Sequence, residues 1–204
     1  MIKFSVAFFL SIFLITSCKQ EVAIVASEDA DQVEIFAANE LSSYLSKIYP
    51  KYKFSVLQEA GKGKTIFLDV NNEDPDISDN PEGYLISADE EIARIVSSGS
   101  TGLIYGVYAL LEHLGCGFYL SDEMLPEPVK EFDFDAWNLS DEPLVEDRYV
   151  FNWHNFISGC TGWDKAHWYE WIDRSQKMGY NTVMVHTYHN NPMHTYEFNG
   201  IEKE

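Results

Sequence analysis

Short apolar runs in the first 120 residues predict β-strands. They comprise Val22–Val25, Phe54–Leu57, Thr65–Val70, Tyr84–Ala88, Ile92–Val96 and Phe118–Leu120. Runs of this length, bounded by Gly, Asp and Asn residues, are typical of strands in a buried sheet. Only Asp89-Glu90-Glu91 separates the fourth run from the fifth, so these two runs are expected to form a hairpin.

Two longer stretches repeat apolar residues every three or four positions, which is the period of a helix with one buried face. In the first stretch these residues are Val33, Phe36, Ala37, Leu41, Tyr44, Leu45 and Ile48, after cap candidates at 27–31 and before Pro50. In the second, which runs from about Thr101 to Gly115, they are Ile104, Val107, Tyr108, Leu111 and Leu114. Two helices packed on one face of a sheet predict an α+β domain over residues 18–125.

Beyond this domain the pattern changes twice. Residues 126–147 continue a stretch rich in proline and carboxylates without any amphipathic period, which predicts a linker. Residues 148–204 then contain a strand at Tyr149–Trp153, a helix that ends at Gly179 and a strand at 181–186. On that helix Trp168, Trp171, Ile172, Ser175 and Met178 are expected to face one way. Strand, helix and strand in this order predict a βαβ unit with a parallel strand pair, which does not fold alone because both faces of a parallel sheet must be covered.

The first residues predict export. Met1–Lys3 supplies one positive charge, and the apolar run Phe4–Ile15 is too short for a membrane-spanning helix but suits a secretory signal. Leu14–Cys18 resembles the lipobox of bacterial lipoproteins, which implies that residues 1–17 are a signal peptide and that Cys18 is lipidated. The protein would then be exported and anchored by lipid to a bacterial membrane, in the periplasm or at the cell surface. An ordinary signal peptide followed by an incidental cysteine is the alternative.

Charge and cysteine content narrow the possible partners. The chain has 33 acidic and 14 basic residues and a formal charge of -19, so it should repel nucleic acid. Three cysteines cannot build a disulfide framework, and Cys116 and Cys160 belong to different predicted domains, which favours free thiols over a bridge. His186, His189 and His194 match no zinc signature. We therefore expect neither a metal nor a cofactor.

A family resemblance adds to this picture. It is carried by the segment Ala38–Leu45, by the helix motif Gly-x-x-Tyr-Gly-x-Tyr-x-Leu-Leu-Glu at 102–112, and by Leu114-Gly115 and Phe118-Tyr119 after it. These residues resemble the N-terminal domain of the α-glucuronidases of glycoside hydrolase family 67 and the related second domain of β-hexosaminidases. In those families a (β/α)8 glycosidase barrel follows the domain. The resemblance implies that residues 148–204 are the first βαβ unit of such a barrel, which a chain of this length would leave truncated.

The candidate binding residues follow from the position of barrel active sites, which lie at the carboxyl ends of the strands. After the first strand stand Trp153, His154 and Asn155, and after the second stand His186, Tyr188, His189, Asn190 and Asn191. Aromatic rings cover the apolar face of a sugar, whereas amides and imidazoles bond its hydroxyl groups. The resemblance supports the same choice, because the Asn190-Asn191 pair and the segment 152–155 are similar to glucuronidase barrel segments. A barrel rim that is merely filled by aromatic side chains is the alternative.

Catalytic residues are not found in this sequence. Glycoside hydrolysis needs two carboxylates beside the bond, but Asp164, Glu170 and Asp173 fall in or beside a helix that should pack outside the barrel. A whole barrel takes about 250 residues, so we expect the catalytic carboxylates beyond residue 204 and this chain to be inactive. The sequence thus predicts an exported glycoside hydrolase-like lipoprotein of the α-glucuronidase type, acting in polysaccharide breakdown. The alternative is a non-catalytic carbohydrate-binding or scaffolding lipoprotein.

Overall fold

A six-stranded mixed sheet forms the centre of the first domain in the computed structural model, which describes residues 19–71, 76–152, 160–185 and 196–203. Its strands are β1 (Gln20–Ala26), β2 (Tyr52–Leu57), β3 (Thr65–Val70), β4 (Tyr84–Ala88), β5 (Ile92–Ser97) and β8 (Leu139–Asp141). They lie in the order β2-β1-β3-β5-β4-β8. The first four are parallel, whereas β4 and β8 run antiparallel to their neighbours. The predicted hairpin is confirmed as β4 and β5.

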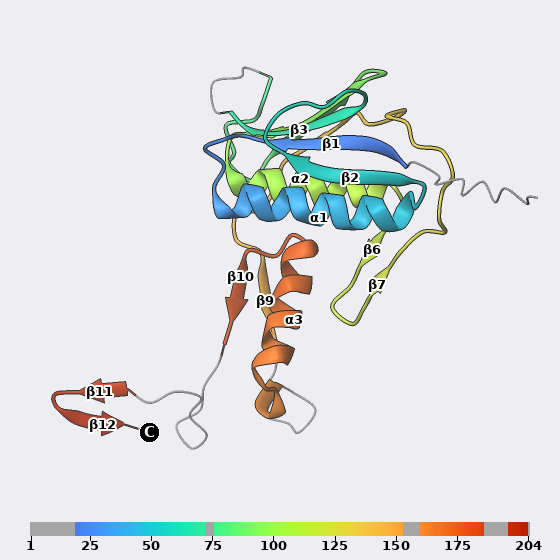
Figure 1. The fold of residues 1–204 in the computed structure, drawn as a ribbon. Coiled ribbons are helices and arrows are strands. Elements are labelled where there is room, and N and C mark those ends of the chain that lie inside the picture. The colour runs from blue at the N-terminus through green and yellow to red at the C-terminus, as the bar shows by residue number, and fades with distance from the viewer. Residues whose placement is uncertain (1–18, 72–75, 153–159, 186–195, 204) are drawn as a thin grey trace, which may run out of the picture.

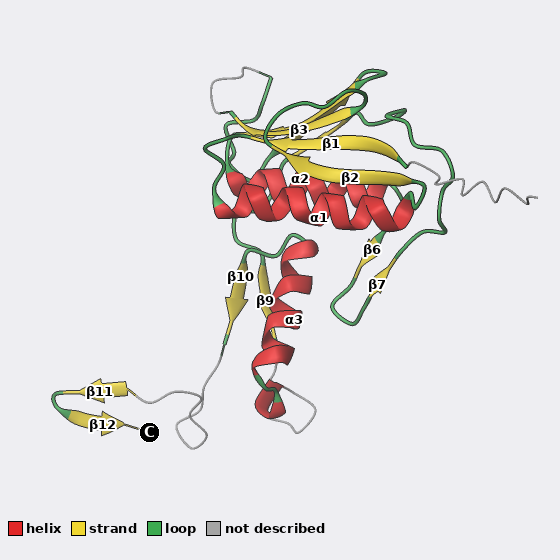
Figure 2. Ribbon diagram, viewed as in Figure 1, coloured by secondary structure: helices red, strands yellow, loops and turns green. Residues whose placement is uncertain are grey.

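The helices α1 (Gln32–Ile48) and α2 (Ser100–His113) cover one face of this sheet, as Figure 2 shows. A capping box begins α1: the Asp31 carboxylate accepts from the backbone N–H of Val33 and Glu34, and the Glu34 carboxylate accepts from the N–H of Asp31. This arrangement holds Glu34 inward, so Val33 and Phe36 are half-exposed, contrary to the sequence prediction. The sheet with two helices on one face is confirmed.

The glycine-rich motif of α2 allows the helix to lie close to the sheet. A Cβ atom on Gly102 would stand 2.2 Å from the Ser97 hydroxyl oxygen and 2.3 Å from the Gly83 carbonyl oxygen. At Gly106 it would meet Ile95 and Tyr84 at 3.0 Å. Larger residues at these positions would push the helix off β4 and β5, which explains why the sequence has glycine there.

Residues 126–147, predicted as a linker, also contribute to the first domain. They supply β8 at the edge of the sheet, and their side chains Phe132, Phe134 and Trp137 are buried in its hydrophobic core. The Trp137 ring packs against Phe132 and Phe134 at centroid distances of 5.8 and 4.9 Å. Just before this segment, β6 (Gly117–Phe118) pairs with β7 (Glu123–Met124). The segment lacks a regular period because single aromatic residues, rather than one helix or strand face, enter the core.

The βαβ unit predicted from the sequence is present. It consists of β9 (Tyr149–Phe151), α3 (Lys165–Lys177) and β10 (Thr182–Met184), and its two strands are parallel. A short 3-10 turn, Cys160–Gly162, precedes α3, and β11 (Tyr196–Phe198) and β12 (Ile201–Lys203) form a terminal hairpin. The unit lies against α1 and α2 on the side away from the sheet (Figure 1). No helix among these described residues is long and apolar enough to cross a membrane.

The buried face of α3 differs from the predicted stripe. Trp171 and Ser175 are buried as expected, but Ile172 and Met178 are half-exposed and Lys177 is buried instead. Trp171 also packs against Trp163 and Trp168, with ring centroids 5.7 Å away in each case. The predicted apolar face was wrong at the carboxyl end of α3, because the last turn of this helix contacts the first domain through charged groups.

Candidate functional site

The carboxyl ends of β9 and β10 lie side by side, because Phe151 pairs with Met184 in the parallel register. The two segments that hold the candidate sugar-binding residues follow this edge. Those residues, which are Trp153, His154, Asn155, His186, Tyr188, His189, Asn190 and Asn191, lie outside the described part of the chain, as does Cys18. Their role therefore stays a prediction.

The carboxylates of the α3 region make contacts within the helix itself. Asp164 caps α3 by accepting from the backbone N–H of Ala166 and His167. Glu170 pairs with Arg174 at 2.5 Å, and Asp173 pairs with Lys177 at 2.8 Å. These three groups thus lie in or directly before α3, as the sequence indicates, and contribute to the stability of this helix. Among the residues with described positions, no group of acids, histidines and cysteines could hold a metal ion.

Cys116 and Cys160 are both buried free thiols, as expected. Burial raises the pKa of Cys116 to about 11 and also raises that of Cys160. A thiol is a nucleophile only as thiolate, so neither side chain is suited to covalent catalysis near neutral pH.

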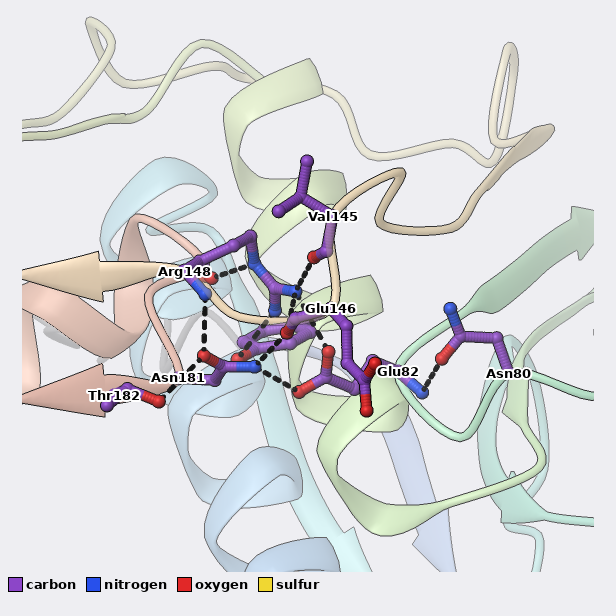
Figure 3. Close-up of polar contacts among 9 residues, drawn as sticks. Asn80, Glu82, Val145, Glu146, Arg148, Asn181 and Thr182 are labelled. Atoms are coloured by element: carbon purple, nitrogen blue, oxygen red, sulfur yellow. Dashed lines mark hydrogen bonds and ion pairs between the residues drawn. The ribbon is translucent and has the colours of Figure 1, made fainter.

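The opposite, amino-terminal edge of the strand pair carries a dense polar cluster with the first domain (Figure 3). The Arg148 guanidinium contacts a Glu82 carboxylate oxygen at 2.9 Å and donates to the Gly179 carbonyl oxygen at 2.6 Å. The Asn181 amide accepts from the Arg148 backbone N–H and donates to the other Glu82 oxygen at 3.2 Å. Arg148 also lies over the Tyr105 ring, 5.5 Å from its centroid. One acidic side chain thereby holds the starts of both strands.

Arg148 directly precedes β9 and therefore lies at the end of the strand opposite the candidate sugar-binding edge. A cavity of about 260 Å³ beside Arg148 is lined by Tyr84, Tyr105, Glu112 and other residues of both parts. The two cations on its wall, Arg148 and Lys177, are already paired with carboxylates. They therefore offer no free positive charge to a uronic acid.

Lys177, at the end of α3, forms a further polar contact between the two parts. Its ammonium nitrogen lies 2.6 Å from Glu123 of β7, 2.8 Å from Asp173 and 3.7 Å from Glu40 of α1. It also donates to the Tyr44 hydroxyl at 3.1 Å, and only 7% of its side chain is exposed. Sequence reasoning missed this residue, because a lysine in the last turn of an amphipathic helix normally faces water.

Comparison with known proteins identifies the fold. The structure is similar to N-terminal regions of carbohydrate-active enzymes of three glycoside hydrolase families. A family GH115 4-O-methyl-α-glucuronidase, specific for decorated arabinogalactans, matches 80% of this chain with a TM-score of 0.58 and 18% identity. A GH138 enzyme that targets the pectin rhamnogalacturonan II matches 79%, with a TM-score of 0.56 and 18% identity. The GH20 β-N-acetylhexosaminidase of Streptomyces coelicolor A3(2) matches 83%, with a TM-score of 0.52 and 19% identity.

The resemblance to α-glucuronidases and β-hexosaminidases is thus confirmed at the level of fold. This chain spans 24%, 18% and 30% of the lengths of the GH115, GH138 and GH20 proteins, respectively. No protein-family model and no curated protein sequence matches it.

Proposed function

We propose that this chain forms the N-terminal part of an exported, lipid-anchored glycoside hydrolase of the α-glucuronidase type, acting in polysaccharide breakdown. In this proposal residues 19–147 form a non-catalytic accessory domain, and residues 148–185 begin a (β/α)8 barrel. The carbohydrate would bind at the carboxyl ends of β9 and β10, and the catalytic carboxylates would come from later barrel strands.

The observation that carries the proposal is the parallel β9–α3–β10 unit docked on the helices of the first domain. A parallel pair needs cover on both faces and further strands at its edges. Apolar side chains of the unit are instead half-exposed: Phe151 is 40% and Met184 49% exposed. Such a surface is what the start of a larger parallel sheet leaves uncovered.

The extent of the fold comparison supports the same conclusion. Residues 1–147 make up less than three quarters of the chain, whereas the GH115 and GH20 matches cover 80% and 83% of it. Each match must therefore extend beyond the first domain into the βαβ unit. The likeness concerns a domain together with the element that follows it, which is more specific than a likeness of the domain alone.

The first experiment is to read the DNA downstream of codon 204. The proposal expects an open frame with further alternating strands and helices, and with Asp or Glu residues directly after strands. In parallel, the 204-residue chain and any longer product would be assayed on aryl α-glucuronides and β-N-acetylhexosaminides. We expect turnover only from the longer product, because positioning a sugar without an acid and a nucleophile gives little rate.

Turnover by the 204-residue chain that is lost in Asp164→Ala or Glu170→Ala would overturn this assignment, since helix carboxylates would then be catalytic. The engagement of those carboxylates within α3 favours one second candidate, a carbohydrate-binding lipoprotein without hydrolysis. Saturable binding of an oligosaccharide by this chain, with a stop codon directly after codon 204 and no turnover, would support that candidate instead.

A further inference from the structure

Lys177 belongs to the βαβ unit, but most of its partners belong to the first domain. Glu40 and Tyr44 lie on α1 and Glu123 lies on β7, whereas Asp173 is one turn earlier on α3 itself. The Tyr44 hydroxyl accepts from Lys177 and donates to Glu123, which closes a ring of three polar groups. The ammonium group also lies 5.5 Å from the Tyr44 ring centroid.

This environment is satisfied only when the two parts are docked. A buried ammonium group is costly unless it is paired and hydrogen-bonded. Burial by itself would lower the pKa of Lys177, but its bonds to Asp173, Glu123 and Tyr44 outweigh that effect and raise the pKa above the ordinary value. With the unit undocked, Asp173 alone would remain as a partner, and α1 and β7 would lose the cation that their carboxylates share.

Lys177 and Arg148 line the same cavity, but they contact different elements of the first domain. Arg148 directly follows the connecting segment, so its bond to Glu82 fixes the chain near the point where the two parts are joined. Lys177 lies 29 residues later in the chain, at the end of α3, and reaches a different region of the first domain. Contacts with several different elements of the first domain restrict the rotation of one part on the other.

We propose that Lys177 is the positioning residue that couples the βαβ unit to the first domain, so that both unfold in one cooperative transition. This coupling concerns the 204-residue chain itself and does not depend on the glycosidase proposal. Its loss would free the unit to undock while the sheet and its two helices stay folded.

The experiment is urea unfolding of the full chain, followed by two signals. Far-UV circular dichroism reports mainly on α1 and α2, whereas four of the five tryptophans lie in residues 148–204 and dominate the fluorescence. The wild type should give superimposable curves. In Lys177→Met the fluorescence transition should move to lower urea and separate from the dichroism transition. The matched control is Lys165→Met, which removes an exposed lysine from the first turn of the same helix and should leave the curves superimposed.

A double-mutant cycle covers the case in which Lys177→Met shifts both signals together. Glu123→Gln removes the closest carboxylate from the first-domain side, and the double variant Lys177→Met/Glu123→Gln should lose no more stability than the worse single variant. Lys177→Arg keeps the positive charge, so its dichroism and fluorescence transitions should lie closer together than those of Lys177→Met. Additive midpoint shifts in the cycle, or superimposed Lys177→Met curves with the wild-type midpoint, would overturn the proposal.

Discussion

Replacement of Trp137 by alanine would show whether residues 126–147 are part of the first domain's fold. The Trp137 side chain is only 1% exposed and packs against Phe132 and Phe134. Truncation of a buried Trp or Phe to alanine typically costs about 3–5 kcal/mol, because apolar contacts are lost and a cavity remains. Domains of this size are stable by about 5–15 kcal/mol, so the loss is a large part of the total.

Urea unfolding followed by circular dichroism at 222 nm measures this effect. With a slope of about 1–3 kcal/mol per molar urea, a loss of about 4 kcal/mol lowers the midpoint by more than about 1 M. The control is Leu144→Ala in the same segment, because Leu144 is 98% exposed and its truncation should change stability by less than about 0.5 kcal/mol. If Trp137→Ala unfolds at the midpoint of the Leu144→Ala control, the segment is a linker after all and our reading of the core is wrong.

Two further predictions concern the pH range of the Lys177 contact and the membrane anchor. Burial would raise the pKa of Glu123, but hydrogen bonds from Lys177 and Tyr44 lower this pKa below its ordinary value of 4.5. The Glu123 carboxylate therefore contributes its full stabilisation above pH 4.5, and this contribution is lost as the pH falls through the lowered pKa. The raised pKa of Lys177 gives the opposite pH dependence. The Lys177 ammonium contributes its full stabilisation below its ordinary pKa of 10.5, and this contribution is lost as the pH rises through the raised pKa. The other titratable groups around the ammonium are Glu40, Asp173, Tyr44 and Tyr108. The dichroism and fluorescence unfolding curves are therefore expected to superimpose from about pH 5 to 10. If the two curves separate within this range and superimpose outside it, the assigned role of the Lys177 contact is wrong. Cys18→Ala should leave the protein uncleaved or soluble when cells are fractionated, whereas unchanged fractionation with membranes would refute the lipid anchor.

The elements of the first domain could be predicted because each has a strong local signal. The capping residues before α1 and the apolar repeats of both helices fix their positions to within a residue or two. The strand order could not be predicted, since β1, β2, β3 and β5 pair across helices and loops that the local pattern does not connect. The burial of Trp137 was missed for a related reason: isolated aromatic residues in an irregular acidic segment have no period, so only tertiary contact shows that they belong to the core.

The βαβ unit was predictable for the same reason as the helices, but its attachment to the first domain was not. Glu82, Glu40 and Glu123 are three acids among 33 in the chain, and nothing in their local sequence distinguishes them from surface carboxylates. Each becomes distinctive only because the fold brings a cation to it from a residue at least 54 positions away. A buried ion pair depends on two positions that are distant in the sequence. The local sequence pattern around either position does not indicate its partner.

This attachment has a consequence for the candidate sugar site. The contacts of Arg148, Asn181 and Lys177 hold the amino-terminal side of the strand pair. Arg148 and Asn181 precede β9 and β10, and Lys177 ends the helix that leads into β10. The carboxyl ends, where Phe151 and Met184 pair, therefore point away from the first domain (Figure 1). An accessory domain held in this way cannot itself close over a ligand at the strand ends. Its effect on that edge must be indirect, through the orientation that these contacts impose on β9 and β10. Variants of Lys177 are therefore expected to change the stability of the chain and the orientation of the unit, and not to remove a direct contact with a sugar.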